Sequence, residues 1–170
     1  MISDEALMLD FQRGSRPAFE ELFGRYHERL YGFFRRRLGN GEAAGDLTQE
    51  TFLAVIRATS RYEPRALVRT YLYGIAFKLL AAERRNRARG TPPDPGLIAV
   101  GDSDERLWVR QALDRLDAND REILMLREYE QLSYAEIAEL LRLPLNTVRS
   151  RLFRARMELK GILAPAKGEA

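Results

Sequence analysis

Apolar residues recur every three or four positions along the first half of the chain, and this spacing predicts amphipathic helices. A short helix is expected after Ser3 and through Phe11, and a longer one after the break at Gly14 and Ser15. Three arginines lie in the last turn of the longer helix, and Gly39 just beyond it favours a left-handed helix end. The apolar stripe of the longer helix covers about six turns and consists of Phe19, Leu22, Phe23, Tyr26, Leu30, Phe33, Phe34 and Leu38.

Two more helices are expected before residue 90. The first contains the apolar residues Leu47, Phe52, Val55 and Ile56, with Asp46, Gln49 and Glu50 near its start. A loop that contains Pro64 is predicted from Ser60 to Arg69. The second helix, TYLYGIAFKLLAAERRNR, is predicted to direct Leu72, Ile75, Ala76 and Leu79 inward.

Residues 90–103, GTPPDPGLIAVGDS, contain three prolines and three glycines without a helical period, which predicts a flexible linker. Two small helical domains, 1–89 and 104–170, are expected on either side of it. In the second domain, one helix carries Leu107, Leu113 and Leu116, and the next carries Ile123, Leu124 and Leu126. Because no strand pattern is present, the predicted fold class is all-α, with two helical domains joined by a flexible linker.

The stretch LSYAEIAELLRLPLNTVRSRLFRARMEL predicts a helix-turn-helix in the second domain. Ser133 and Glu136 have the spacing of a capping box, so a helix is expected to begin there. Pro144 is expected to stop this helix, and Asn146 to cap the next one. The apolar faces of the two helices consist of Ile137, Ala138, Leu140 and Leu141, and of Val148, Leu152, Ala155 and Leu159.

The outward side of the last helix has the composition of a DNA-reading surface. It carries Arg149, Ser150, Phe153, Arg154 and Met157, with Arg151 and Arg156 at its flanks. A basic helix is commonly only a solvated face, but here the charge is segregated. Residues 104–141 hold five arginines against ten carboxylates, whereas residues 142–160 hold six basic groups against one glutamate. This polarity favours a one-sided phosphate footprint.

Composition narrows the function classes. The chain has no cysteine, one histidine and a net charge of +3, and 25 of its 28 basic residues are arginine. We therefore expect no thiolate metal site, no cofactor and a reducing cytoplasm as its location. There is no run of eighteen apolar residues and no signal-peptide pattern, so neither a membrane span nor export is expected.

Four sequence blocks, taken in order, resemble the extracytoplasmic function group of bacterial RNA polymerase sigma factors. They are AFEELFGRYHERLYGFFRRRLG, DLTQETFLAVIR, YLYGIAFKLL and LSYAEIAELLRLPLNTVRSRLFRAR. The resemblance implies an alternative sigma factor that directs promoter-specific initiation, with core RNA polymerase, promoter DNA and an anti-sigma factor as partners. It also implies that the first domain binds the polymerase and the −10 element, and that the second reads the −35 element.

By this resemblance, contacts to the clamp helices of the largest polymerase subunit fall to Asp46, Leu47, Gln49, Glu50 and Phe52. Contacts to the −35 element fall to Thr147, Arg149, Ser150, Arg151, Phe153 and Arg154. For the −10 element, basic and aromatic residues interleave as a single-strand binder requires, and the candidates are Arg61, Tyr62, Arg65, Arg69, Tyr71 and Lys78. Lys78 stands where the family usually has asparagine, so we expect a phosphate contact in place of a base contact.

Simpler interpretations stay open for several of these residues. Asp46 could cap a helix and Glu50 could favour its first turn, while Tyr62 and Tyr71 could be core rings. For the whole chain, the alternative is a helix-turn-helix regulator that acts without replacing the sigma factor, as a dimer on a palindromic site. An enzyme is not expected, because no paired-carboxylate metal motif, glycine-rich phosphate loop or activated nucleophile is present.

Overall fold

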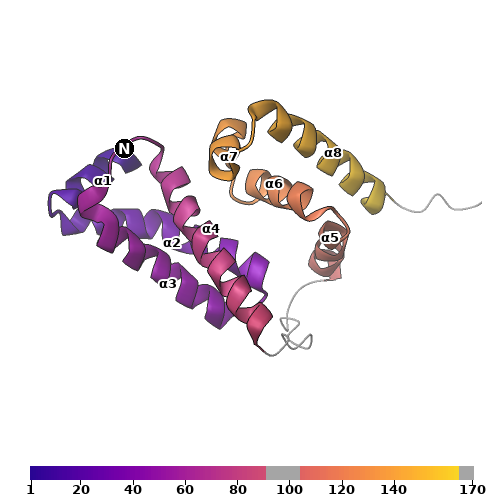
Figure 1. Cartoon of the computed structure of the whole chain (residues 1–170), viewed down its shortest axis with the longest axis horizontal. Helices are drawn as coiled ribbons and strands as arrows, with labels where there is room; N and C mark the ends of the chain where they lie inside the picture. The colour runs from indigo at the N-terminus through magenta and orange to yellow at the C-terminus, as the bar shows by residue number, and fades with distance from the viewer. Residues whose placement is uncertain (91–103, 165–170) are drawn as a thin grey trace, which may run out of the picture. The chain divides into compact units, whose positions relative to one another are not determined.

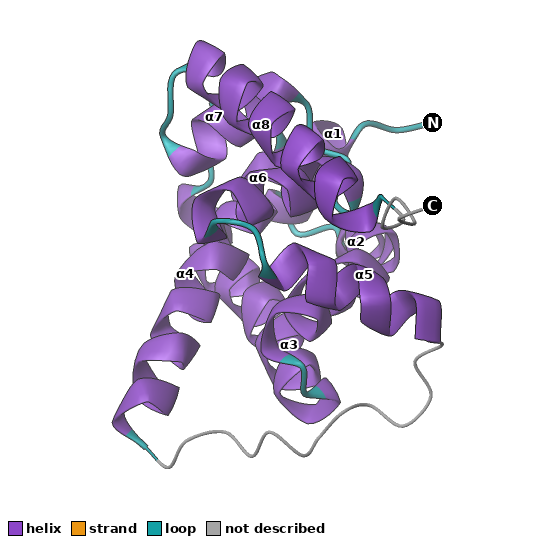
Figure 2. Ribbon diagram, turned by 90° about the vertical axis from the view of Figure 1, so that its right-hand side faces the viewer, coloured by secondary structure: helices purple, strands orange, loops and turns teal. Residues whose placement is uncertain are grey.

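The computed structural model describes residues 1–90 and 104–164. These residues fall into two compact units, one within Met1–Ala99 and the other within Val100–Ala170, and each is described by itself. Every regular element in the described residues is a helix, which confirms the predicted all-α class (Figure 1 and Figure 2). The linker predicted at 90–103 lies almost wholly outside the described residues, so the domain boundaries stay predictions.

The first unit consists of α1 (Asp4–Gln12), α2 (Arg16–Leu38), α3 (Gly41–Ala58), the short 3₁₀ helix η1 (Thr59–Arg61) and α4 (Val68–Arg89). Serine hydroxyls cap the N-termini of the first two helices. Ser3 Oγ accepts a hydrogen bond from the Ala6 amide at 3.1 Å, and Ser15 Oγ accepts one from the Ala18 amide at 3.3 Å. Gly39 ends α2 at φ 69°, in the left-handed region that glycine adopts without strain. The predicted cap at Ser3, the predicted helix start after Ser15 and the predicted helix end at Gly39 are confirmed, whereas the capping hydrogen bond of Ser15 was not predicted.

All four α-helices of the first unit contribute side chains to its core. Phe33 is fully buried, and its ring lies 5.2 Å from that of Phe34 and 5.5 Å from that of Tyr73. On α4 the most deeply buried side chains are Val68, Leu72, Tyr73, Ala76 and Leu80. The prediction that Ile75 and Leu79 point inward was partly wrong, since both are only half-buried. Ile56 of α3 is 45% exposed and is not a core residue either.

Helix α3 begins earlier than the sequence pattern suggested. The Asn40 side chain accepts from the amides of Glu42 and Ala43 at 2.9 and 3.1 Å, so it is the N-cap. Asp46 and Glu50 therefore lie inside the helix, and their interpretation as a cap and a first-turn acid was wrong. The loop after α3 is also shorter than predicted, because η1 extends to Arg61 and α4 begins at Val68.

The second unit consists of α5 (Asp104–Asp114), α6 (Ala118–Glu128), α7 (Tyr134–Leu141) and α8 (Leu145–Leu163). Helix α8 packs against the three others, as Figure 1 shows most clearly for α6 and α7. The fully buried side chains include Ile123, Leu126, Ile137, Val148 and Leu152 from the predicted apolar faces, together with Leu132 between α6 and α7. Leu159 is half-buried, and Leu116 follows the end of α5.

The predicted capping box at the start of α7 is confirmed. The Ser133 amide donates to Glu136 Oε2 at 2.6 Å, and the Glu136 amide donates to Ser133 Oγ at 3.1 Å. The C-cap of α7 is Arg142, a non-glycine residue in the left-handed region at φ 55°. The prediction of Asn146 as N-cap was wrong, because α8 begins at Leu145. Pro144 takes the cap position, and its carbonyl accepts from the amides at 147 and 148.

Candidate nucleic-acid interface

The outward face of α8 presents apolar side chains between arginines. Phe153 is 69% exposed and Met157 is 52% exposed, whereas Val148, Leu152 and Ala155 on the opposite side are at most 1% exposed. Arg149 is exposed and forms no hydrogen bond or ion pair within the described residues. A large ring held in water beside a free guanidinium has no packing role in this unit, but both groups suit the edges of bases in a major groove.

Among the other predicted residues of α8, Ser150 and Arg154 are exposed, whereas Thr147 and Arg151 are half-buried. The hydroxyl of Ser150 donates to the Thr147 carbonyl at 3.1 Å. These contacts belong to the first turns of α8. They fix the backbone where the helix would enter a groove, since the N-terminal residues of a recognition helix lie closest to the bases.

Arg154 lies at one flank of this face and is held by a carboxylate that the sequence analysis missed. Its Nε and Nη2 donate to Asp120 Oδ2 and Oδ1, both at 2.7 Å, and the Asp120 side chain is 2% exposed. These hydrogen bonds raise the pKa of the Arg154 guanidinium above its ordinary value. Three of the five N–H groups stay available. Asp120 thus orients Arg154 and leaves the outer end of the guanidinium for another acceptor.

Asp120 could not be recognised from the sequence. It follows the N-cap Asp117 by three residues, where a carboxylate is ordinarily explained by the helix dipole. Its burial and its pairing with a residue 34 positions later depend on the packing of α6 against α8. Only the tertiary structure identifies it as a positioning residue.

Arg156 lies at the other flank and is also bound to α6. Its Nη2 donates to Glu128 Oε1 at 2.8 Å, and the two side chains are 45% and 54% exposed. Hydrogen bonding to Glu128 raises the pKa of Arg156 above its ordinary value. The outward face of α8 therefore has a free arginine near its start and two flanking arginines that carboxylates of α6 hold.

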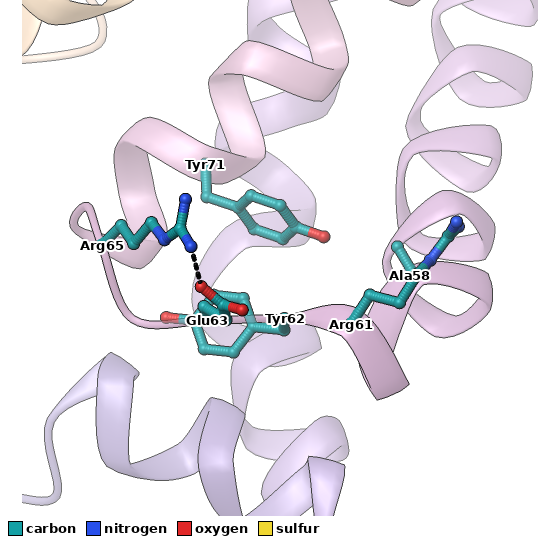
Figure 3. Close-up of a pocket in the computed structure, with 6 residues that line it drawn as sticks. All are labelled: Ala58, Arg61, Tyr62, Glu63, Arg65 and Tyr71. Carbon is teal, nitrogen blue, oxygen red and sulfur yellow. Dashed lines mark ion pairs between the residues drawn. The ribbon is translucent and has the colours of Figure 1, made fainter.

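The first unit has a pocket of about 440 Å³ between the end of α3 and the start of α4 (Figure 3). Its lining brings together four of the predicted −10 residues with Ala58 and Glu63, and those four are Arg61, Tyr62, Arg65 and Tyr71. The Tyr62 and Tyr71 rings meet edge to face at 5.3 Å, and burial raises the pKa of both hydroxyls. Arg65 forms an ion pair with Glu63. Two aromatic rings and two cations around a cavity can hold a planar, electron-rich group.

The other two predicted −10 residues, Arg69 and Lys78, do not line the pocket. Arg69 is half-buried, and its positive charge partly offsets the rise that burial causes in the pKa of Tyr26. Lys78 is exposed on α4. Tyr62 is only 7% exposed, so its interpretation as a core ring and its place in the pocket wall are both correct.

Helix α3 carries the residues predicted to bind the polymerase. Asp46, Gln49 and Glu50 are exposed on it, and we call these three the α3 polar patch. Leu47 is half-buried beside them. Phe52 was predicted as a direct contact, but it is 4% exposed and its ring packs 4.7 Å from that of Phe23. A partner could touch Phe23, which is 40% exposed, but could hardly reach Phe52.

Comparison with known proteins identifies both units. The family model "Sigma-70 region 2" matches residues 22–90, and "Sigma-70, region 4" matches residues 106–159. The chain is 34% identical to the RNA polymerase sigma-H factor of Pseudomonas aeruginosa, over 98% of this chain and 97% of that protein. It is 34% identical to the sigma factor CarQ of Myxococcus xanthus, with 90% and 93% covered, and 30% identical to the ECF sigma-E factor of Haemophilus influenzae, with 96% and 97% covered.

Solved structures agree with these sequence matches. A structure of CnrH in complex with the cytosolic domain of CnrY matches with a TM-score of 0.73 and 25% identity, over 94% of this chain and 96% of that one. The sigma factor RpoE of Bartonella quintana, in complex with the anti-sigma factor NepR, shares the fold with a TM-score of 0.68 and 22% identity, with 85% and 96% covered. Within the described residues, no helix has the length and apolar character needed to cross a bilayer.

Proposed function

This chain belongs to the extracytoplasmic function group of sigma-70 factors, and we propose how its two units divide the work of an alternative sigma factor. Such a factor binds core RNA polymerase and directs transcription initiation from a specific set of promoters. The observation that carries the assignment is that sigma-70 regions 2 and 4 match this chain in order, each within a separate compact unit. The curated relatives match it along nearly its whole length.

The proposal assigns the pocket of the first unit to a base of the −10 element. A base that leaves the DNA stack loses its stacking energy, so it needs aromatic and cationic partners elsewhere. The pocket supplies Tyr62, Tyr71, Arg61 and Arg65, and its volume of about 440 Å³ accommodates a nucleobase. Lys78, exposed on α4, would contact a phosphate of the same strand. We propose that the captured base belongs to the non-template strand.

The α3 polar patch is proposed to bind the clamp helices of the largest polymerase subunit. Its three residues are exposed on α3, with Leu47 half-buried beside them. Exposed polar groups around a partly buried apolar side chain are typical of a protein interface. We expect Phe52 to contribute through packing under this surface and not by direct contact.

The second unit is proposed to read the −35 element with α8. Arg149 and Phe153 would lie over the bases, Arg154 would be aimed by Asp120, and Arg156 would lie beside the backbone. Because the Arg154 guanidinium is already oriented, little further rotamer freedom is lost when it binds DNA.

We propose that a further partner, an anti-sigma factor, controls the chain. Two similar structures support this proposal, since CnrH was solved with the cytosolic domain of CnrY and RpoE with the anti-sigma factor NepR. The proposed place of action is the cytoplasm, where the polymerase and the chromosome are. The chain would act there by binding alone, while the polymerase supplies the catalysis.

Transcription with purified core polymerase tests the assignment. Core enzyme, the chain and a library of genomic fragments are combined, and transcripts are sequenced. We expect defined start sites that require both proteins, and none from either alone. If no fragment gives a transcript that depends on the chain, the sigma-factor assignment is refuted.

A further inference from the structure

Helix α1 is bonded to the chain segment that builds the proposed base pocket. The side-chain amide of Gln12, the last residue of α1, donates to two backbone carbonyls at once. Its Nε2 lies 2.9 Å from the Thr59 oxygen and 2.9 Å from the Tyr62 oxygen. These carbonyls lie at the beginning of η1 and just after its end. A single side chain therefore fixes the start of the segment that carries Tyr62.

A second residue of α1 fixes the end of the same segment. The Val68 amide, the first of α4, donates to Glu5 Oε1 at 3.0 Å. Leu67, at the N-cap position of α4, provides no capping side chain, so a carboxylate 63 residues earlier in the chain takes that role. Burial raises the pKa of Tyr62, and the negative charge of Glu5 raises it further. Both ends of residues 62–67 are thus held by α1.

Helix α1 is itself firmly attached to the first unit. Leu7 and Met8 are buried at 4% and 0% exposure. Asp4 accepts a hydrogen bond from Arg25 Nη1 at 2.7 Å and another from the Tyr26 hydroxyl, both on α2. A support that is fixed at its own N-terminus and along its buried face can hold a loop in one geometry.

We propose that Gln12 and Glu5 are positioning residues that set the base preference of the pocket at the −10 element. The inference rests on the proposed role of the pocket in base capture. Tyr62 comes from the braced segment and Tyr71 from α4, so the distance between their rings depends on where that segment lies. Without the brace, residues 62–67 would sample more conformations, and the pocket would lose its selective shape.

The test uses the full chain in holoenzyme with core polymerase and promoters randomised in the −10 element. Gln12→Met keeps the volume of the side chain and removes both hydrogen bonds. Glu5→Ala removes the cap of α4, while Glu5→Gln keeps an acceptor oxygen. We expect Glu5→Ala to lower the enrichment of the preferred −10 base roughly fivefold, the ratio that corresponds to one net hydrogen bond, and Gln12→Met, which removes two, to lower it at least as much. Glu5→Gln should retain most of the preference.

The control variant is Asp10→Ala. Asp10 lies on the same helix, and within the described residues its carboxylate pairs with the exposed Arg13 alone, at 3.4 Å, so its loss should leave the −10 preference unchanged. Preference at the −35 element and affinity for core polymerase should be unchanged in every variant. A uniform loss of transcription with intact base preference would overturn the inference, because that result describes a merely structural role.

Tyr71→Ala, assayed in parallel, distinguishes a failure of this inference from a failure of the proposal that the pocket captures a base. If Tyr71→Ala alters the −10 preference while Gln12→Met and Glu5→Ala do not, the positioning role is refuted and the pocket keeps its function. If Tyr71→Ala also leaves the preference unchanged, the pocket does not capture a base, and the inference fails with it. Because two independent sites of the brace are altered, misfolding of one variant still leaves the other to decide.

Discussion

Replacing Glu128 by glutamine should strengthen DNA binding by the second unit at low salt and make it more sensitive to salt. Glu128 holds Arg156 at the flank of α8, with 2.8 Å between Oε1 and Nη2. Glutamine has nearly the same shape but no charge, so it leaves the Arg156 guanidinium free to pair with a phosphate. The perturbation thus adds one cation to the DNA face without adding a residue to it.

The expected magnitudes follow from the exposure of the pair and from counterion release. The two side chains are 45% and 54% exposed, so solvent screens the ion pair and its loss should change the stability of folding by less than about 1 kcal/mol. Each additional phosphate contact steepens the plot of log K against log salt by about 0.9. Between 50 and 200 mM salt, the affinity advantage of the variant should therefore shrink about 3.5-fold.

Fluorescence anisotropy of holoenzyme on a labelled −35 duplex, titrated at several salt concentrations, measures this slope. Glu139→Gln is the matched control, because Glu139 is exposed on α7 and pairs with no arginine of the described chain, yet its replacement changes the net charge equally. Equal slopes for Glu128→Gln and the native protein, or an equal increase in the control, would show that Arg156 does not lie beside a phosphate.

Three further results are expected. Alanine at all three residues of the α3 polar patch should weaken binding to core polymerase and leave −35 affinity unchanged. Arg149→Ala should instead weaken −35 binding by roughly 1–3 kcal/mol and leave polymerase binding unchanged. The same loss in both assays for both variants would contradict the division of roles. Leu152→Ala, at a position 1% exposed, should lower the unfolding free energy of the second unit by roughly 2–5 kcal/mol, measured by urea titration, and a change under about 0.5 kcal/mol would contradict its core position. Lys78→Asn should alter the −10 base preference and reduce the salt sensitivity of open-complex formation; identical preferences and slopes would leave Lys78 without a DNA contact.

Local sequence signals predicted the helices well, because each such signal acts within one or two turns. Ser3 and the pair formed by Ser133 and Glu136 cap helices as expected, and Gly39 ends one. The wrong prediction of Asn146 as an N-cap also came from a local signal. Asparagine is a favoured N-cap in general, but Pro144, two residues earlier, already has the extended backbone that an N-cap requires.

Long-range pairing was decided only by the tertiary structure. Four of the predicted −10 residues share one pocket while Arg69 and Lys78 do not line it, and no spacing along the chain could separate these two groups. The same holds for Phe52, which belongs to an amphipathic helix and is buried against the rings of Phe19 and Phe23 of α2.

The sequence by itself determined the helical class, the position of the helix-turn-helix and the residues that α8 turns outward, because helical periodicity and capping are properties of neighbouring residues. The tertiary structure decided which of those residues are free and which are held. Asp120 reaches Arg154 across 34 residues, Gln12 reaches Tyr62 across 50, and Glu5 reaches Val68 across 63. Such contacts form only when packed helices bring distant backbone and side-chain groups within hydrogen-bonding distance, and this proximity has no signature in the local sequence.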